Sequence, residues 1–308
     1  MVEISVVIPV FKTETYINEL AQRLLAVLNE LGIEFEILFI DDGSPDNSWT
    51  LIETLANQVS QIRGIKLSRN FGQHSAIAAG LTYASGNWIV VMDGDLQDLP
   101  EDIPVLYRAA LNSSNSVIAR RMARDEKFLK KFSSNIFYKI FSKLTGSSLT
   151  HEYGNFGIYT RKVIDSINRM PENERSFGLF AEWVGFQRSE VLVSRAKRGH
   201  DKSSYTFGSL FRLAGKSIVS YSNKPLYLVT SAGFVILAAS VTFAIALLVR
   251  YLIFGVQAQG WTSLMVALFL NTGLIIGTLG IIGIYIGSVF NEVKRRPQFL
   301  IDTDTQDR

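Results

Sequence analysis

Cysteine is absent from this 308-residue sequence, which excludes disulfide bonds, zinc–thiolate sites and a cysteine nucleophile. The absence also fits a reducing compartment. The sequence has only three histidines, and none of them lies in the H-x-x-x-H or H-E-x-x-H spacing of a zinc site. No Walker P-loop, no G-x-G-x-x-G after a strand and no G-x-S-x-G elbow is found, so kinase and dinucleotide-binding functions lose their main support.

A large excess of one charge is also missing. The chain has 31 Lys and Arg against 28 Asp and Glu, a net charge of +3, so it is not a polycation built for nucleic acid. No signal peptide is predicted at the N-terminus, because Met1 leads almost directly into the apolar run Ile4–Ile8 without a basic region or a cleavage site. We therefore expect the N-terminal part of the chain to stay in the cytoplasm.

Short apolar runs alternate with amphipathic stretches over residues 1–120. The pattern predicts βαβ units, and therefore an α/β, Rossmann-like fold with a mostly parallel sheet covered on both faces. Ligands of such sheets bind beyond the carboxyl ends of the strands. The predicted strands are Ile4–Ile8, Phe35–Ile40, Ile65–Leu67, Trp88–Met92 and Ser116–Ala119, and the predicted helices are 15–31, 47–59, 74–84 and 101–112.

Two long uncharged stretches follow in the C-terminal third, where hydrophobic residues raise the overall share to 47%. Leu226–Val249 and Leu264–Val289 contain no charged residue, and 24 helical residues span roughly 36 Å, enough to cross a bilayer. Basic residues precede the first stretch and follow the second, which predicts that both ends face the cytoplasm. We therefore expect a multi-pass protein of the cytoplasmic membrane; Arg250 lies near the outer end.

Two amphipathic segments lie before the predicted membrane helices. Residues 124–144 are basic and helical in spacing, and fit either a surface helix on the core or an interfacial helix on anionic lipid. Residues 206–223 are expected to lie along the membrane surface. The predicted organisation is a cytoplasmic catalytic domain (1–205), a juxtamembrane helix (206–224), a two-helix anchor (225–291) and a cytoplasmic tail (292–308), disordered after Ile301.

The densest group of polar side chains is Asp93-Gly94-Asp95-Leu96-Gln97-Asp98, directly after the predicted strand Trp88–Met92. Carboxylates gathered at a strand end are unfavourable unless something positive binds there. Carboxylate and carbonyl oxygens suit Mg²⁺ or Mn²⁺, and such an ion would neutralise a departing diphosphate. The alternative is a solvated acidic turn that caps the next helix.

A second acidic group, Asp41-Asp42, follows the strand Phe35–Ile40. Asp46 or Asn47 is suited to cap the next helix, but two further carboxylates exceed what a cap needs. Asp42 is placed to accept hydrogen bonds from a nucleobase or ribose. Basic residues that suit diphosphate or lipid phosphate lie elsewhere in the chain: Arg120, Arg121, Lys131, Arg195, Arg198 and Lys202.

These segments together resemble glycosyltransferase family 2, and within it the polyprenyl-phosphate sugar transferases. The resemblance covers nearly the whole chain. It is carried by VIPVF (7–11), IDDGSPDNS (40–48), LSRNFGQHSAIAAGL (67–81), MDGDLQD (92–98), RGHDKSSYTF (198–207), EVKRRPQF (292–299) and two C-terminal apolar segments. It implies a GT-A-type catalytic domain and inverting transfer of a hexose from a UDP- or GDP-sugar to undecaprenyl phosphate, for modification of cell-envelope glycans.

The resemblance also implies roles for individual residues. Pro9 and Asp42 would touch the base, and Asp93 the nucleotide, while Asp93, Asp95 and Gln97 would bind Mg²⁺ or Mn²⁺. The implied donor-binding set is completed by Phe11, Glu14, Asp41, Asp95 and Arg121. The implied catalytic set is Asp95, Arg121, Lys131, Asn155 and Arg198, of which the three basic residues would face the phosphates. The family also implies a homo-oligomer such as a tetramer.

Three departures from the family pattern are informative. Lys12 and Thr13 stand where the family has Asn-Glu, and the acid is displaced to Glu14. The family's Gly-Asp-Phe-Arg is Gly-Asn-Phe-Gly here, at 154–157, so Asn155 cannot act as a base. The usual Lys before the aromatic of the juxtamembrane motif is Ser204. A phosphate acceptor is already largely ionised at neutral pH and needs positioning more than deprotonation.

Three other functions share some of these sequence features. A processive polysaccharide synthase would carry Gln-x-x-Arg-Trp and more membrane segments, and that motif is absent. A catalytically degenerate membrane scaffold that binds a nucleotide-sugar remains open because of Asn155 and Gly157, as does transfer to a different lipid. A transporter is disfavoured because two uncharged helices offer no polar pathway.

Overall fold

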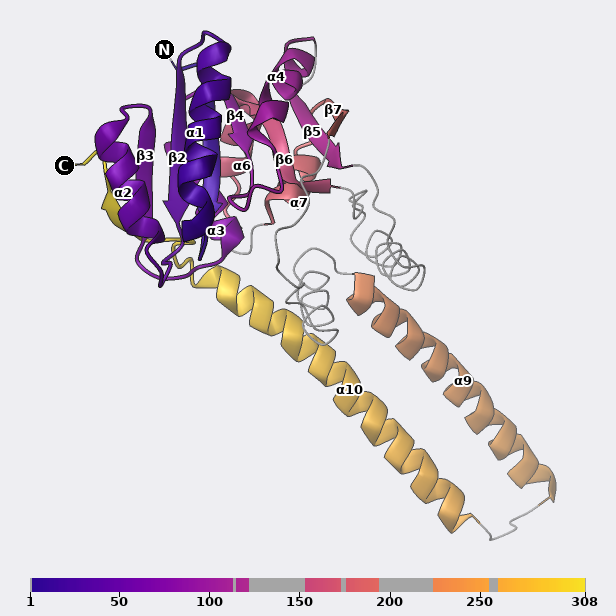
Figure 1. Cartoon of the computed structure of the whole chain (residues 1–308). Helices are drawn as coiled ribbons and strands as arrows, with labels where there is room; N and C mark the ends of the chain where they lie inside the picture. The colour runs from indigo at the N-terminus through magenta and orange to yellow at the C-terminus, as the bar shows by residue number, and fades with distance from the viewer. Residues whose placement is uncertain are drawn as a thin grey trace. The chain divides into compact units, whose positions relative to one another are not determined.

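The computed structural model describes residues 2–112, 115–121, 153–172, 176–193, 224–254 and 260–307. These residues belong to two compact units. One unit contains a β-sheet with its helices and includes the C-terminal residues from Arg296 onwards; the other contains two long helices (Figure 1). The predicted helices over 124–144 and 206–223 lie outside the described residues.

The first unit is built on an eight-stranded sheet in the order β7-β5-β6-β4-β1-β2-β3-β8. β1, β2, β3 and β4 are mutually parallel, as are β5 and β7, whereas β6 runs antiparallel to β4 and β5. This confirms the predicted α/β fold with a mostly parallel sheet. The strands are β1 Ile4–Val10, β2 Phe35–Asp41, β3 Ile62–Leu67, β4 Trp88–Val91, β5 Ser116–Arg121, β6 Tyr153–Thr160, β7 Arg188–Val193 and β8 Ile301–Asp304.

Helices cover both faces of the sheet. α1 (Glu14–Glu30), α2 (Ser48–Gln58) and α4 (Ile103–Leu111) lie on the viewer's side in Figure 1. α3 (Gln73–Tyr83), α6 (Arg161–Asn168) and α7 (Phe177–Trp183) contact one another and the other face. A short 3₁₀ turn at Pro100–Asp102 precedes α4.

The core explains why β1 is apolar except for Ser5, whose hydroxyl donates to Glu36 Oε1. All seven residues of β1 are buried, as expected for a central strand with helices on both faces. Alternate side chains of β1, from Ile4 to Val10, pack with Leu20, Leu24 and Leu28 of α1 and with Phe39 of β2. In the register, Val10 pairs with Asp41, so β1 and β2 end at the same level. The loops that follow these strands therefore start from a rigid edge.

The C-terminal residues form an ordered strand, so the prediction of a disordered tail is wrong. β8 pairs antiparallel with β3 at the edge of the sheet. Arg63 donates from Nε and Nη2 to the two carboxylate oxygens of Asp304, at 3.0 and 2.5 Å. Ser68 N–H donates to the Leu300 carbonyl, and Gly64 N–H donates to Thr305 Oγ1. The polar composition of Ile301–Asp304 reflects an edge strand stabilised by a buried ion pair.

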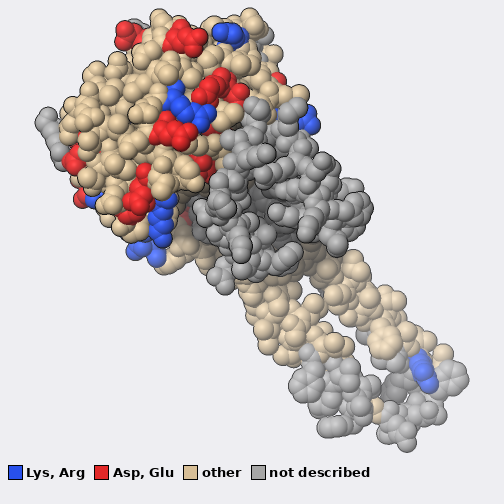
Figure 2. Space-filling model, in the orientation of Figure 1, with Lys and Arg blue, Asp and Glu red and all other residues tan. Residues whose placement is uncertain are grey.

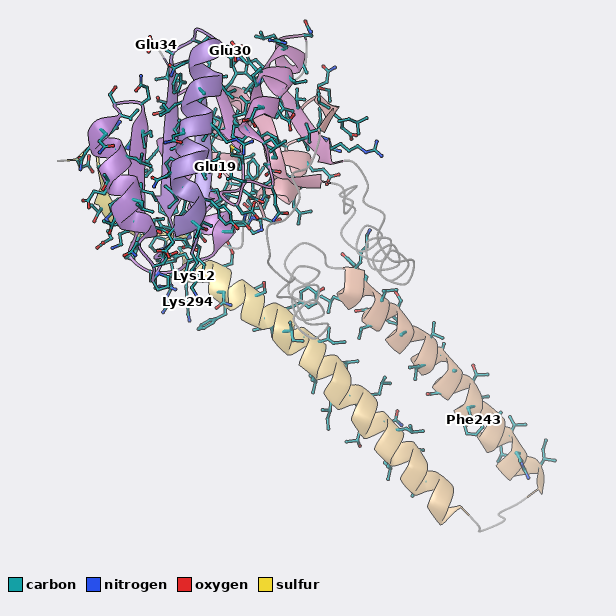
Figure 3. All side chains as sticks on the ribbon, in the orientation of Figure 1. Lys12, Glu19, Glu30, Glu34, Phe243 and Lys294 are labelled. Atoms are coloured by element: carbon teal, nitrogen blue, oxygen red, sulfur yellow. The ribbon has the colours of Figure 1, made fainter. Side chains whose placement is uncertain are left out.

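The second unit contains α9 (Lys224–Phe254) and α10 (Trp261–Val293). Within α10, Leu270–Val293 is long and apolar enough to cross a membrane, with a mean hydropathy of 2.0. In α9 a shorter apolar segment, Leu226–Ser240, is found. Charged side chains crowd the unit with the sheet and are nearly absent from the long helices (Figure 2). Apolar side chains such as Phe243, which is 66% exposed, point away from α9 (Figure 3).

Candidate active site

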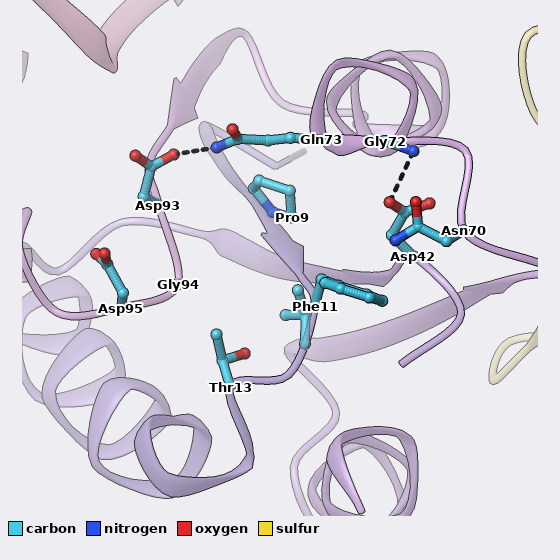
Figure 4. A pocket seen from close by; sticks show the side chains of 11 residues that line it. Pro9, Phe11, Thr13, Asp42, Asn70, Gly72, Gln73, Asp93, Gly94 and Asp95 are labelled. Atoms are coloured by element: carbon cyan, nitrogen blue, oxygen red, sulfur yellow. Dashed lines mark hydrogen bonds between the residues drawn. The ribbon is translucent and has the colours of Figure 1, made fainter. Parts of the chain in front are cut away.

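A pocket of about 470 Å³ lies at the carboxyl ends of β1, β2 and β4, where the parallel sheet predicts a ligand site (Figure 4). Two walls of the pocket, each with aspartate side chains, face each other across the end of β1. Asp42 lies on the side of β2 and α3, and Asp93 and Asp95 lie on the side of β4 (Figure 4). The lining residues are Pro9, Val10, Phe11, Thr13, Asp42, Asn70, Gly72, Gln73, Asp93, Gly94 and Asp95.

Asp42 is fixed by backbone donors from the loop between β3 and α3. The N–H groups of Phe71 and Gly72 donate to its two carboxylate oxygens at 2.7 and 2.8 Å. Burial raises the pKa of Asp42, and these two N–H donors oppose that rise. These two hydrogen bonds connect the loop after β2 to the loop before α3, and both loops form this wall.

Asp41 is fully buried and does not line the pocket. Its carboxylate accepts from Ser44 N–H at 3.3 Å and stabilises the turn after β2. Burial raises the pKa of Asp41, and the hydrogen bonds from Ser44 oppose it. In this structure Asp41 supports the loop, and Asp42 is the residue of the pair that faces the pocket.

Gly43 allows the two loops of this wall to touch. Its φ is +65°, and a Cβ there would lie 2.6 Å from the Arg69 carbonyl carbon and 2.8 Å from Asn70 N. These are backbone atoms, so no side-chain rotation relieves the clash. Any larger residue must push Asn70 and its loop out of the pocket wall.

The family resemblance implies that this wall holds a sugar donor, so we expect Gly43→Ala to raise the KM for that donor about tenfold with a smaller change in kcat, because it displaces the wall that carries Asn70. Gly32→Ala is the matched control. Gly32 has a φ of +64° but nothing within 4 Å of its Cβ position, so it introduces the same backbone strain without the clash. Steady-state kinetics over a donor series measures both variants. Equal donor KM values for the two would contradict the assignment of this wall to the donor.

The wall that carries Asp93 and Asp95, called the acidic wall from here on, is a tight turn between β4 and the 3₁₀ helix. Asp98, which is 3% exposed, accepts from Asp93 N–H at 3.3 Å and holds the start of the turn. Asp95 accepts from Gln97 N–H at 3.1 Å and also from the Gln97 carboxamide. Leu96 between them has φ +57°, a strained value for a branched side chain that is often found at functional sites. The turn brings Asp93 and Asp95 into one pocket wall.

The side-chain oxygens of this turn suit a divalent cation that is also coordinated by a substrate phosphate. Asp93 and Asp95 offer carboxylate oxygens in the pocket, the ligands that Mg²⁺ and Mn²⁺ prefer, whereas Gln97 lies outside the pocket lining and its carboxamide donates to Asp95. Among the described residues, no three His, Asp or Glu side chains come close enough together to hold a metal ion unaided. Mg²⁺ sites with one or two carboxylates are typically completed by substrate phosphates.

Residues 12–14, which depart from the family pattern, follow Phe11 of the pocket lining. Glu14 accepts from Asn47 N–H at 2.9 Å and lies outside the pocket lining. Thr13 lines the pocket, and its buried Oγ1 has no hydrogen-bond partner among the described residues. The displaced acid therefore connects α1 to the loop before α2, and Thr13 takes the place beside the pocket.

Lys12 has a left-handed backbone, with φ +57°, which favours Asn or Gly over Lys. We expect Lys12→Asn to raise the free energy of unfolding by about 0.5–1 kcal/mol, because Asn tolerates this conformation better. Lys12→Ala, which removes the charge and keeps the strain, is the control and is expected to change little. Urea unfolding of the full chain in detergent, followed by tryptophan fluorescence, measures both. Equal stabilisation by Ala would assign the effect to charge instead of backbone strain.

The structure brings part of the implied site together. Pro9, Phe11, Asp42, Asp93 and Asp95 line one pocket, and Asn155 donates to Asp93 at 3.4 Å. The side chains of Arg121, Lys131 and Arg198 lie outside the described residues. Thr13 was named from the sequence only as a departure from the family pattern. Asn70, Gly72 and Gln73 were not singled out, although the segment 67–81, quoted for its resemblance, contains all three.

Comparison with known proteins identifies the family. The sequence model described as Glycosyl transferase family 2 matches residues 5–167, more than half of the chain. An uncharacterized glycosyltransferase of Synechocystis is 36% identical over 302 residues, covering 97% of this chain and 95% of the relative. The chain therefore belongs to glycosyltransferase family 2 and is a glycosyltransferase.

Other similar proteins carry more specific names. The undecaprenyl-phosphate 4-deoxy-4-formamido-L-arabinose transferase of Proteus mirabilis is 34% identical over 306 residues, covering 97% of this chain and 93% of that protein. Among solved structures, glucosyl-3-phosphoglycerate synthase from Mycobacterium tuberculosis superposes with a TM-score of 0.52 at 18% identity. The superposition covers 70% of this chain and 77% of that one, and supports the shared fold.

Proposed function

We propose that this glycosyltransferase transfers a hexose, with inversion, from a UDP- or GDP-sugar to undecaprenyl phosphate at the cytoplasmic membrane. The observation that carries the proposal is the pocket in which Asp42 faces Asp93 and Asp95, in a chain that also has a membrane-length apolar helix. The name of the Proteus mirabilis relative supports the acceptor. The product is a lipid-linked sugar that would serve modification of cell-envelope glycans.

The donor would lie across the pocket from Asp42 to Asp95. Asp42, with its oxygens already oriented by Phe71 and Gly72 N–H, would accept a hydrogen bond from the base, beside Pro9 and Phe11. Asp93, Asp95 and Gln97 would hold a divalent cation, Mg²⁺ or Mn²⁺, which neutralises charge on the departing diphosphate. The Mn²⁺ and UDP-glucose named for the solved Mycobacterium structure are consistent with this donor chemistry.

The acceptor supplies its own nucleophile. A phosphate monoester has its second pKa near 6, so at neutral pH its oxygen is largely ionised and no protein base is required. That oxygen attacks the anomeric carbon from the face opposite the diphosphate, the carbon–oxygen bond to the diphosphate breaks, and the nucleoside diphosphate leaves. This chemistry is compatible with Asn155 in place of the family's Asp. Arg121, Lys131 and Arg198 are proposed to contact the phosphates.

Membrane anchoring would bring the lipid phosphate to the catalytic domain. We propose that α9 and α10 both cross the bilayer, with residues 1–205 and the tail from 292 in the cytoplasm. Basic residues Lys294, Arg295 and Arg296 follow α10, in agreement with a cytoplasmic end. From the family resemblance we also propose that the protein forms a homo-oligomer such as a tetramer.

A transfer assay tests the function. The full chain in detergent is incubated with undecaprenyl phosphate, Mg²⁺ or Mn²⁺, and a panel of UDP-, GDP- and dTDP-sugars. A chloroform-soluble sugar-lipid that appears with one donor supports the proposal and identifies the sugar. Nucleotide binding without a lipid product from any donor would overturn it, and would favour a scaffold or a different acceptor.

A further inference from the structure

The carboxylate of Asp93 is tied by two carboxamides from different parts of the fold. Gln73, the first residue of α3, donates from Nε2 to Asp93 Oδ1 at 2.7 Å (Figure 4). Asn155, on β6, donates from Nδ2 to the same oxygen at 3.4 Å. Residues from α3 and β6 thus converge on one atom of the acidic wall.

Neutral donors suit this position for an electrostatic reason. A short bond to a carboxylate is strong, and it restricts rotation of the Asp93 side chain, while Asp98 holds its backbone N–H. A Lys or Arg in place of Gln73 would also orient the carboxylate, but it would cancel the charge that a cation or a cation-bound diphosphate requires. A carboxamide orients Asp93 and leaves its charge in place.

The geometry also accounts for the departure at 155–157. A carboxylate at position 155 would stand about 3.4 Å from Asp93 Oδ1, where like charges repel. β6 has no room at position 157 for the Arg that would compensate this charge in the family. A Cβ at Gly157 would lie 2.9 Å from the Val117 carbonyl oxygen and 3.0 Å from Tyr159 Oη. Gly157 and Asn155 agree with these constraints, since Gly157 avoids the clash and the neutral Asn155 contacts Asp93 without adding charge.

We infer that Gln73 and Asn155 are positioning residues that form a neutral two-carboxamide clamp on Asp93 and orient this carboxylate for the donor diphosphate. The inference rests on the proposed function, since it takes Asp93 to face the nucleotide-sugar. In this inference Asn155 acts by orienting Asp93, and it neither removes a proton nor binds the lipid acceptor. Gln73 lines the pocket itself, so the test must separate an effect through Asp93 from a direct contact with the ligand.

Nucleotide binding measured in the wild-type and in the Asp93→Ala backgrounds distinguishes these two effects. The dissociation constant of UDP or GDP, whichever the wild type binds more tightly, is measured by calorimetry with Mn²⁺ present. Gln73→Met and Asn155→Leu keep the side-chain size and remove the donor. We expect about tenfold weaker binding for Gln73→Met and about threefold for Asn155→Leu, because the latter bond is longer. In an Asp93→Ala background, each change is expected to alter binding less than twofold.

The double variant Gln73→Met/Asn155→Leu sharpens the test. Each single variant still has one carboxamide on Oδ1, so the double variant is expected to lose more than the product of the two single losses. Asn18→Leu, which removes an exposed amide on α1, is the control and is expected to bind like the wild type. Thermal unfolding of each variant, expected to match the wild type within a few degrees, excludes a general loss of structure.

Two outcomes overturn the clamp. Equal losses in the wild-type and Asp93→Ala backgrounds would show that Gln73 or Asn155 contacts the ligand directly or acts on the fold. Unchanged binding in the double variant would show that Asp93 needs no orientation. Failure of the wild type to bind either nucleotide is a different result, because it overturns the proposed function before the variants are compared.

Discussion

Replacing Asp95 by asparagine is expected to lower kcat for sugar transfer by about 10³-fold and to leave the fold intact. Asp95 lines the pocket, and its Oδ1 accepts Gln97 N–H at 3.1 Å. Asparagine keeps an oxygen for this bond, and a flip of the Gln97 carboxamide lets its oxygen accept from the new amide, so the turn is preserved. What it removes is the negative charge that would hold a cation against the departing diphosphate, where such stabilisation contributes several kcal/mol to the transition state.

The matched control is Asp165→Asn, an exposed carboxylate on α6 whose distance to Arg161 is 3.9 Å. It makes the same chemical change away from the pocket, and its transfer rate is expected to equal that of the wild type. The measurement is the initial rate of sugar-lipid formation over a range of Mn²⁺ concentrations. If Asp95→Asn retains more than a tenth of the wild-type rate at saturating metal, Asp95 is not part of the leaving-group site.

The central part of the fold was predictable because its signals are local. The five predicted strands correspond to β1–β5, and the four helices predicted within residues 1–120 correspond to α1–α4, although β3 begins at Ile62, three residues before the predicted start. Strands buried on both faces are continuous apolar runs, and the intervening helices have one apolar stripe. β6 was missed because its sequence, YGNFGIYT, contains two glycines that weaken the strand signal.

The rest of the site depends on contacts that have no sequence signature. The parallel-sheet rule placed Asp42, Asp93 and Asp95 at one edge, but it could not tell that Asp41 turns inward. Glu14 was expected at the donor, and its bond to Asn47 N–H across 33 residues was not foreseeable from spacing. The Gln73–Asp93 bond likewise depends on where the loop before α3 lies.

The C-terminal strand leads to a large expected effect on stability. Asp304→Ala is expected to lower the free energy of unfolding by about 2–3 kcal/mol, because it removes two charge-assisted hydrogen bonds from the partly buried guanidinium of Arg63. The side chains of Arg63 and Asp304 are only 14% and 3% exposed, and both carboxylate oxygens accept from the guanidinium. Asp302→Ala, two residues earlier, breaks an exposed pair with Lys66 at 3.9 Å and is expected to cost less than about 0.5 kcal/mol.

The pH dependence of the same variant separates the ion pair from simple packing. Burial alone would raise the pKa of Asp304, but the hydrogen bonds from Arg63 and from Gln306 N–H, with the charge of Arg63, lower it below its ordinary value. A lowered pKa means that the stabilisation is complete above the unfolded-state pKa of about 4 and is lost as pH falls through the folded-state pKa. The difference between wild type and Asp304→Ala in urea unfolding should therefore be constant from about pH 5 to 8 and shrink below about pH 4. A difference that stays constant down to pH 3 would assign the effect to packing of β8, and no difference from Asp302→Ala at pH 7 would mean that β8 does not stabilise the sheet.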